Sequence, residues 1–151
     1  MNIRIREGSP GEMVSLSKQI PELENPYEVD EYKKRITGKN NLLLLAGVNG
    51  KPAGFKAAYE WDPDTFYSWM GGVLPEYRNK GIAKALSAEQ EKRIRIMGYS
   101  KIRIKTRNRH KAMIQLLVKE GFFIVDLEKK GAANDFRVIF EKKLTNPKQN
   151  T

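Results

Sequence analysis

The stretch VLPEYRNKGIAKAL, residues 73–86, places basic and small residues where an apolar strand ends and a helix is expected to begin. The first turn of a helix leaves backbone N–H groups without acceptors, and the macrodipole adds about half a positive charge there. Gly81 and Ala83 keep bulky side chains away from these amides, while Arg78 and Lys80 add formal charge. The segment therefore indicates an anion site that could hold a diphosphate, with an ordinary surface turn as the alternative.

Basic residues outnumber acidic ones, 28 to 18, which gives a formal net charge of +10. Such a charge attracts polyanions, including nucleic acid, anionic lipid and phosphorylated small molecules. The basic residues are spread along the chain and are densest over 101–111, so a solvated surface is an equally simple explanation. A nucleic-acid-binding protein is one alternative function. It would need a reading element or exposed stacking aromatics beside the charge, and since neither is evident we expect no nucleic-acid partner.

The chain contains no cysteine. Thiolate nucleophiles, disulfides and cysteine-based metal sites are therefore excluded, and we expect no metal site. The opening MNIRIREG lacks the apolar region of a signal peptide, and no apolar run approaches the roughly 18 residues that a membrane span needs. We expect a cytoplasmic protein with no membrane partner.

The elements that precede the basic segment begin with isoleucines alternating with arginines, the period of a half-buried strand. Ser9, Pro10 and Glu12 then have the order of a capping box with proline at the first helical position. They predict a helix over residues 10–19. A second short helix is predicted over residues 29–36.

A β-hairpin is predicted in the middle of the chain. Residues 42–48 are a continuous apolar run that closes on Asn49-Gly50, and residues 53–59 form the next strand. Asn-Gly is the strongest two-residue hairpin signal because both positions tolerate positive φ.

The next strand and helix would carry the anion site between them. The strand is predicted over residues 66–74 and contains the pair Gly71-Gly72, which usually marks a bulge or the close approach of another group. The helix is predicted over residues 78–97, with an apolar stripe that only Gln90 interrupts.

The remaining elements are a strand over 101–106, a helix over 110–120, and closing strands over 122–127 and 136–144. The tail, residues 145–151, is expected to be frayed.

The order of these elements predicts a mixed α/β fold of the α+β kind, in one domain over residues 1–144. It has about seven strands and four helices, with a mostly antiparallel sheet and one parallel crossover around the long helix.

The stretch around the predicted helix start resembles the acetyl-CoA signature of the Gcn5-related N-acetyltransferase (GNAT) superfamily. Arg78, Gly81 and Ala83 fill its pattern of Arg or Gln, two residues, Gly, any residue, and Gly or Ala. Downstream, Asn108 and the helix end Lys119-Glu120-Gly121-Phe122 resemble a second family block. The order of elements resembles the family over residues 2–144.

The resemblance implies acetyl-CoA as co-substrate and a GNAT-like twisted sheet that splays where the cofactor binds. In the family, the strand before the signature pairs with the pantetheine arm, the signature amides hold the pyrophosphate, and an asparagine approaches the pantetheine. The residues at the matching positions are Gly72, Val73, Leu74, Arg78, Asn79, Lys80, Gly81, Ile82, Ala83, Lys84 and Asn108, and Gly71 precedes them on the strand.

Acetyl transfer to an amine needs the neutral amine, and deprotonating a lysine-like amine of pKa about 10.4 costs about 4 to 5 kcal/mol at neutral pH. Glu60 is the candidate base, since partial burial beside Trp61 would make it a better proton acceptor. Its alternative role is that of an ordinary turn carboxylate. The backbone N–H of Val73 or Leu74 is the candidate donor to the oxyanion.

Many relatives place a tyrosine in the last helix to protonate the leaving thiolate, and here Leu117 stands at that position. Either water or another group supplies the proton, or no dedicated acid is needed. Tyr27, Trp61 and Trp69 are candidates for an acceptor pocket, with the protein core as their alternative role.

The sequence therefore predicts an acetyl-CoA-dependent N-acetyltransferase that transfers the acetyl group to a primary amine by direct attack in a ternary complex, because no cysteine exists to carry it. The acceptor could be a small molecule, a peptide N-terminus or a lysine. The alternative within the family is a catalytically silent acyl-CoA-binding module. A homodimer is a family-level expectation only.

Overall fold

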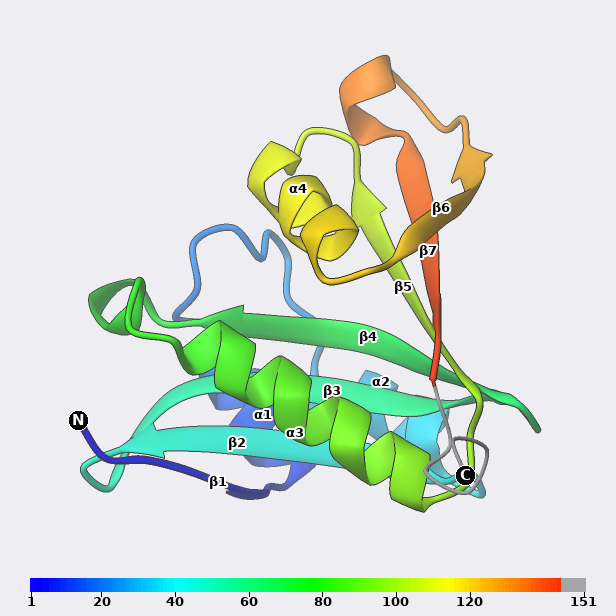
Figure 1. The fold of residues 1–151 in the computed structure, drawn as a ribbon. Helices are drawn as coiled ribbons and strands as arrows, with labels where there is room; N and C mark the ends of the chain where they lie inside the picture. Colours follow the sequence, from blue (N-terminus) through cyan, green and yellow to red (C-terminus); the bar gives the residue numbers. More distant parts are fainter. Residues whose placement is uncertain (145–151) are drawn as a thin grey trace.

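One seven-stranded sheet runs through the molecule, with helices on both of its faces (Figure 1). The computed structural model describes residues 1–144, so the tail predicted to be frayed lies outside the described residues. In chain order the elements are β1 (Ile3–Glu7), α1 (Pro10–Ser17), α2 (Val29–Ile36), β2 (Asn41–Val48), β3 (Lys51–Asp62), β4 (Thr65–Val73), the 3-10 helix η1 (Pro75–Tyr77), α3 (Ile82–Ile96), β5 (Lys101–Arg107), α4 (Lys111–Lys119), β6 (Phe123–Glu128), the 3-10 helix η2 (Ala133–Asp135) and β7 (Arg137–Lys143).

The strand order is β1-β2-β3-β4-β5-β7-β6. All neighbouring strands are antiparallel except β4 and β5, which are parallel and are joined through α3. The predicted fold class, a largely antiparallel sheet with one parallel crossover around the long helix, is confirmed.

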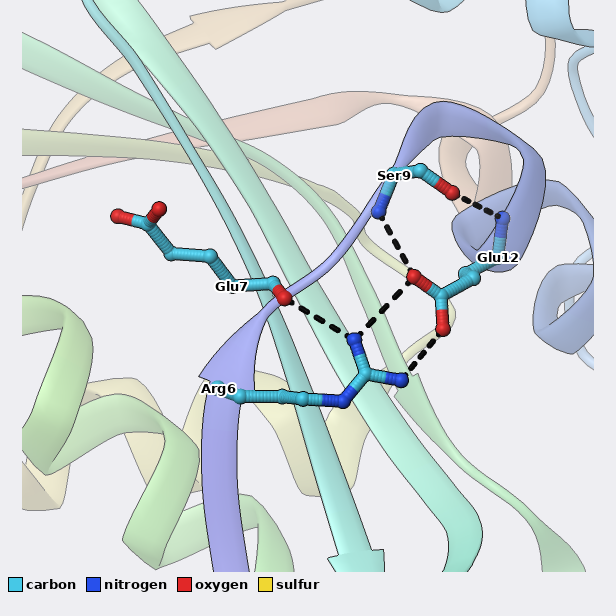
Figure 2. A network of polar contacts seen from close by, with 4 residues as sticks. All are labelled: Arg6, Glu7, Ser9 and Glu12. Atoms are coloured by element: carbon cyan, nitrogen blue, oxygen red, sulfur yellow. Dashed lines mark hydrogen bonds and ion pairs between the residues drawn. The ribbon is translucent and has the colours of Figure 1, made fainter.

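The capping box predicted at the start of α1 is present (Figure 2). Ser9 Oγ accepts from the Glu12 amide at 3.2 Å, and Glu12 Oε1 accepts from the Ser9 amide at 3.0 Å. Arg6 at the end of β1 donates to both oxygens of the Glu12 carboxylate. The network therefore satisfies first-turn amides and fixes the angle at which α1 leaves β1.

The predicted hairpin joins β2 and β3. Asn49 and Gly50 have φ values of 51° and 83°, and Val48 pairs with Lys51 across the turn. Positive φ at both central residues matches the right-handed twist of the flanking strands.

Two clusters of buried side chains lie on opposite faces of the sheet. One joins α3 and α4 to residues such as Leu44, and the other joins α1 and α2 to interleaved residues such as Leu43 and Leu45. The apolar run of β2 is continuous because both faces of this strand are buried. Each fully buried leucine contributes about 1.5 to 3 kcal/mol of transfer free energy.

The prediction that the long helix begins at Arg78 was wrong. Pro75–Tyr77 is a short 3-10 helix, and α3 begins only at Ile82. Asn79 and Gly81 between them have φ values of 61° and 82°, which a helix cannot contain. The basic residues therefore lie on a loop before the helix and not in its first turn.

Within residues 1–144 no helix is both long and apolar enough to cross a membrane.

Candidate functional site

Strands β4 and β5 are paired along only part of their length. The pairing runs from Thr65 with Lys101 to Ser68 with Ile104. Beyond Ser68, β4 continues to Val73 along β3, while β5 continues along β7, so the two strands separate (Figure 1). Each leaves backbone N–H and C=O groups facing the other strand, and of those on β4 the Val73 carbonyl accepts a hydrogen bond from Arg78 Nε. Such edges can accept an extended ligand as an additional strand.

The bulge in β4 lies at Trp69, two residues earlier than the predicted position. Ala57 pairs with Met70 and Ala58 with Ser68, so Trp69 is the extra residue. The bulge begins the separation from β5, because Ser68 is also the last β4 residue that pairs with that strand.

The pair Gly71-Gly72 is regular strand, and each glycine makes room for a side chain on one face. A Cβ on Gly71 would lie 3.1 Å from Lys56 Cγ, and a Cβ on Gly72 would lie 2.7 Å from Ile20 Cδ1. The glycines therefore mark places where another group comes close to the strand, as predicted. The groups that come close are side chains of the protein itself, Lys56 and Ile20.

The loop before α3 and its first turn expose consecutive backbone amides. The first intrahelical bond runs from Ala85 N to Gly81 O at 3.0 Å. Among the described residues, the amides of residues 79–84 have no acceptor, and no side chain caps the helix. A Cβ on Gly81 would meet nothing within 4 Å, so the space beside these amides is open. This geometry suits an anion with several oxygens.

The side chain of Arg78 is turned toward the α1–α2 loop. Its Nη1 donates to Glu22 Oε1 at 2.9 Å, Nη2 pairs with Glu22 Oε2, and Nε donates to the Val73 carbonyl at 3.2 Å. Glu22 thus neutralises a charge that was predicted to belong to the anion site. Lys80 remains without an ion pair among the described residues and lies over the Tyr77 ring at 5.8 Å.

The two predicted oxyanion donors differ in the structure. The Leu74 amide already donates to Ala53 O at 2.8 Å, toward β3. Because successive amides of a strand point in opposite directions, the Val73 amide faces the side that β5 has left. Of these two amides, only that of Val73 is therefore placed to donate into the gap.

Asn108 follows β5 at the far edge of the gap. Its side-chain amide donates to Ala133 O at 3.2 Å, and its backbone amide donates to Phe136 O at 2.8 Å. These bonds attach the end of β5 to η2 and to the start of β7. Its side-chain oxygen has no partner among the described residues.

Tyr27 and Trp69 are brought together on the face that α1 and α2 cover. Their ring centroids are 5.2 Å apart, and the guanidinium of Arg35 lies 4.3 Å from the Trp69 centroid and 5.3 Å from that of Tyr27. Tyr27 is exposed, while Trp69 is the bulge residue beside the gap. These rings line the approach to the gap from that face.

Trp61, the third predicted pocket residue, is not part of this group. It packs against Tyr67 at 5.3 Å and under the Arg103 guanidinium at 5.2 Å, at the end of the sheet where β4 and β5 are paired.

Glu60, the predicted base, also lies at the paired end. Its partner in the sheet is Phe66, which itself pairs with Ile102 of β5. Tyr99 donates to the Glu60 carboxylate at 2.6 Å, and Asn40 donates to the Tyr99 hydroxyl at 2.7 Å. The structure does not bring this carboxylate to the gap and uses it instead in a tertiary hydrogen bond.

Leu117 is 3% exposed and belongs to the core cluster under α3 and α4. Its side chain has no proton to donate, as expected from the sequence. Lys56 was not among the residues predicted from the sequence. It is the only charged residue in the otherwise apolar run 53–59, and its side chain lies across Gly71. A single charge within a buried strand was the signal that could have found it.

Comparison with known proteins agrees with this geometry. The model of the family described as "Acetyltransferase (GNAT) family" matches residues 12–122. An acetyltransferase of Yersinia pestis is 30% identical over 121 residues, which cover 79% of this chain and 85% of the relative.

Two solved structures have a similar fold. The ribosomal-protein-S18-alanine N-acetyltransferase of Escherichia coli superposes with a TM-score of 0.83 at 16% identity, covering 95% of each chain. A GNAT family acetyltransferase of Elizabethkingia anophelis, solved with acetyl-CoA bound, gives 0.74 at 22% identity, covering 95% of this chain and 99% of that one.

The family predicted from residues 73–86 and from the order of elements is thereby confirmed, since the family model covers well over half of the chain. The chain belongs to the GNAT family of acetyltransferases.

Proposed function

We propose that this acetyltransferase carries the acetyl group of acetyl-CoA directly to a primary amine across the gap between β4 and β5. The observation that supports it most is the coincidence of three features: strands that part after Ser68, a row of free amides over residues 79–84, and open space beside Gly81. The resemblance of the fold to a structure with acetyl-CoA bound agrees with this use of the gap.

The pyrophosphate of acetyl-CoA would bind the amides of residues 79–84, with Lys80 adding charge. Each helix-end interaction contributes only about 0.3 to 2 kcal/mol, so several must act together. The pantetheine would extend along the free edge of β4 from Gly72 toward the bulge, with Asn108 at the opposite edge. The acetyl group would then lie where the two strands part.

The amine would approach from the face of Tyr27 and Trp69. Its lone pair attacks the thioester carbon, and the Gly71 amide, which faces the same side as the Val73 amide and lies nearer the bulge, stabilises the developing oxyanion. The predicted base, Glu60, does not face the gap. In this scheme water therefore carries the amine proton away. The chain has no cysteine for an acyl-enzyme, which leaves direct transfer in a ternary complex.

The experiment uses the two glycines at the ends of α3 as a matched pair. Gly81 and Gly98 have φ values of 82° and 96°, and a Cβ on either would meet nothing within 4 Å. Alanine at each position therefore carries a similar backbone strain of about 1 kcal/mol. Only Gly81→Ala places a methyl group beside the free amides.

Calorimetric titration with acetyl-CoA should show binding to the wild type and to Gly98→Ala, and binding at least about 10-fold weaker, a loss of about 1.4 kcal/mol, for Gly81→Ala. Equal weakening in both variants, or none in either, would contradict the proposed diphosphate site. Release of CoA thiol across a panel of amines then tests transfer. Binding without turnover for any amine would favour the silent acyl-CoA-binding module.

A further inference from the structure

A small cavity lies on the α3 and α4 face of the sheet, next to the point where β4 and β5 part. Its volume is about 20 Å³, room for about one water molecule. Ile104, the last β5 residue that pairs with β4, lines one wall. The polar lining residues come from β3, α3 and the end of α4, and are Lys56, Ser87, Gln90, Glu91 and Glu120.

Lys56 reaches this cavity by crossing β4. It lies on β3, opposite Gly71, and a Cβ on Gly71 would be only 3.1 Å from Lys56 Cγ. Because the cavity is also lined by Ile102 and Ile104 of β5, the lysine side chain must extend over β4 to share it. Its ammonium group is thus directed toward the point where the gap begins.

The cavity contains hydrogen-bond donors without acceptors. Lys56 forms no hydrogen bond or ion pair with any described residue. Gln90 is 2% exposed, and its Nε2 is buried without a partner. Unpaired buried donors are costly, about 1 to 3 kcal/mol each. The buried Gln90 Nε2 and the unpaired ammonium of Lys56, a residue of intermediate exposure, both border this space, so an acceptor atom placed there would satisfy them.

The surroundings of the Lys56 ammonium favour loss of its proton. Glu91 is already bound by Arg95 at 2.9 Å and by Lys142 at 3.0 Å. Removal from water lowers the pKa of Lys56, and Glu120, the remaining carboxylate of the cavity, only partly opposes this. A lysine with a lowered pKa is a better proton donor at neutral pH.

We propose that Lys56 is the acid that protonates the thiolate leaving from acetyl-CoA, in place of the hydroxyl that Leu117 cannot supply. The inference rests on the proposed function. When the tetrahedral adduct collapses, the C–S bond breaks and its electron pair stays on sulfur. The Lys56 ammonium gives one proton to that sulfur, and Gln90 Nε2 donates a second hydrogen bond. The products are the amide and the CoA thiol, and neutral Lys56 regains a proton from solvent.

Lys56→Met and Lys56→Arg test this step, because methionine keeps the length without charge and arginine keeps charge without a transferable proton. Lys51→Met, on the same strand but exposed, removes one charge as the matched control. We expect kcat to fall about 10- to 100-fold in Lys56→Met, a modest loss because a thiolate is already a good leaving group. KM for acetyl-CoA should change little. Lys56→Arg should retain an intermediate kcat.

The pH profile separates catalysis from structure. The wild type should lose kcat on a basic limb below the ordinary lysine pKa of 10.5, as Lys56 deprotonates. Lys56→Met should lack that limb. An unchanged kcat and an unchanged profile in this variant would overturn the proposal.

A second readout does not depend on turnover. The ammonium of Lys56 should lower the pKa of the bound CoA thiol, which the ultraviolet absorbance of the thiolate measures during a pH titration. In Lys56→Met the pKa of the bound thiol should return toward that of free CoA measured in the same buffer, while desulfo-CoA should bind both proteins equally. A bound thiol with the same pKa in wild type and Lys56→Met would refute the role of Lys56. A wild type that binds no CoA would refute the proposed function itself. Should Lys56→Met fail to fold by thermal denaturation, the pH profile of Lys56→Arg carries the test, because arginine stays protonated and this variant should lack the basic limb.

Discussion

The two ends of strand β4 have the same neighbour on one side and different surroundings on the other. From Thr65 to Ser68 the strand is hydrogen-bonded to both β3 and β5, and its side chains are buried. From Met70 to Val73 it is bonded to β3 alone, and its side chains are partly exposed. One continuous strand is therefore a core element at its first end and an unpaired edge facing β5 at its second.

The difference shows where the site could be placed at low cost to stability. At the paired end Phe66 is fully buried and packs on Tyr99 at 4.7 Å. At the free end, a Cβ on Gly71 would meet Lys56 and the Phe55 carbonyl, and a Cβ on Gly72 would meet Ile20. Substitutions at the first end should therefore change stability, and those around the second end should change binding or turnover.

Phe66→Ala should have the largest effect. Removing a fully buried phenylalanine costs about 3 to 5 kcal/mol of unfolding free energy, through lost transfer energy and the cavity left behind. Urea denaturation measures this. The binding of acetyl-CoA per folded molecule should stay near the wild-type value, so a selective loss of binding with stability intact would break the contrast between the two ends.

Glu60→Gln tests the catalytic role that the sequence predicted for a residue at the paired end. Glutamine keeps a weaker acceptor for the Tyr99 hydroxyl, and we expect a loss of about 1 kcal/mol in unfolding free energy. We expect kcat to stay within about 3-fold of the wild type, since the carboxylate does not face the gap. A loss of 100-fold or more in kcat, with the fold retained, would instead support Glu60 as the base.

Glu22→Gln concerns the free end. It removes the carboxylate that neutralises Arg78 beside the free amides. We expect acetyl-CoA to bind about 2- to 5-fold more tightly, because one repulsive charge near the diphosphate is removed and the site is partly screened. Calorimetry at low and high salt measures the gain, which should shrink as salt rises. Weaker binding would mean that Glu22 holds Arg78 in its binding position.

The ion pair between Arg78 and Glu22 should also affect stability at low pH, and this is the smallest of the expected effects. The hydrogen bond from Arg78 lowers the pKa of Glu22 below its ordinary 4.5. Its stabilising contribution is therefore present above that value and is lost as the pH falls through the lower, folded-state pKa. The melting temperature should drop slightly more for the wild type than for Glu22→Gln between about pH 5 and pH 3. Parallel curves would show that this exposed pair contributes nothing to stability.

Local signals in the sequence predicted local structure well. The capping box of Ser9 and Glu12 and the Asn49-Gly50 turn were both found as predicted. The helix start was misplaced because Arg78 and Asn79 continue a pattern compatible with a helix, and only the positive φ of Asn79 and Gly81 moves the start to Ile82. Backbone conformation at a loop depends on what packs around it, which a local pattern does not contain.

The functional site was predicted only in part, because a sequence pattern shows which residues are adjacent along the chain and not which ones meet in space. The residue types around Gly81 indicated an anion site because free helix amides and the absence of a side chain are properties of adjacent residues. Glu60 was chosen for its place at a strand end, and its partner Tyr99 lies 39 residues away in the sequence. Lys56 and Gln90 were not considered for chemistry, since only the packing of α3 against the sheet brings both to one cavity.

The sequence by itself determined the order of elements, the hairpin, the first helix cap and the family, because each depends on residues that are neighbours along the chain. The tertiary structure decided where β4 leaves β5, that the Glu60 carboxylate lies away from the gap, and which side chains share the cavity beside it. Those features depend on register and on side chains that meet from distant segments, and a shift of one residue in a strand would turn each of them to the opposite face.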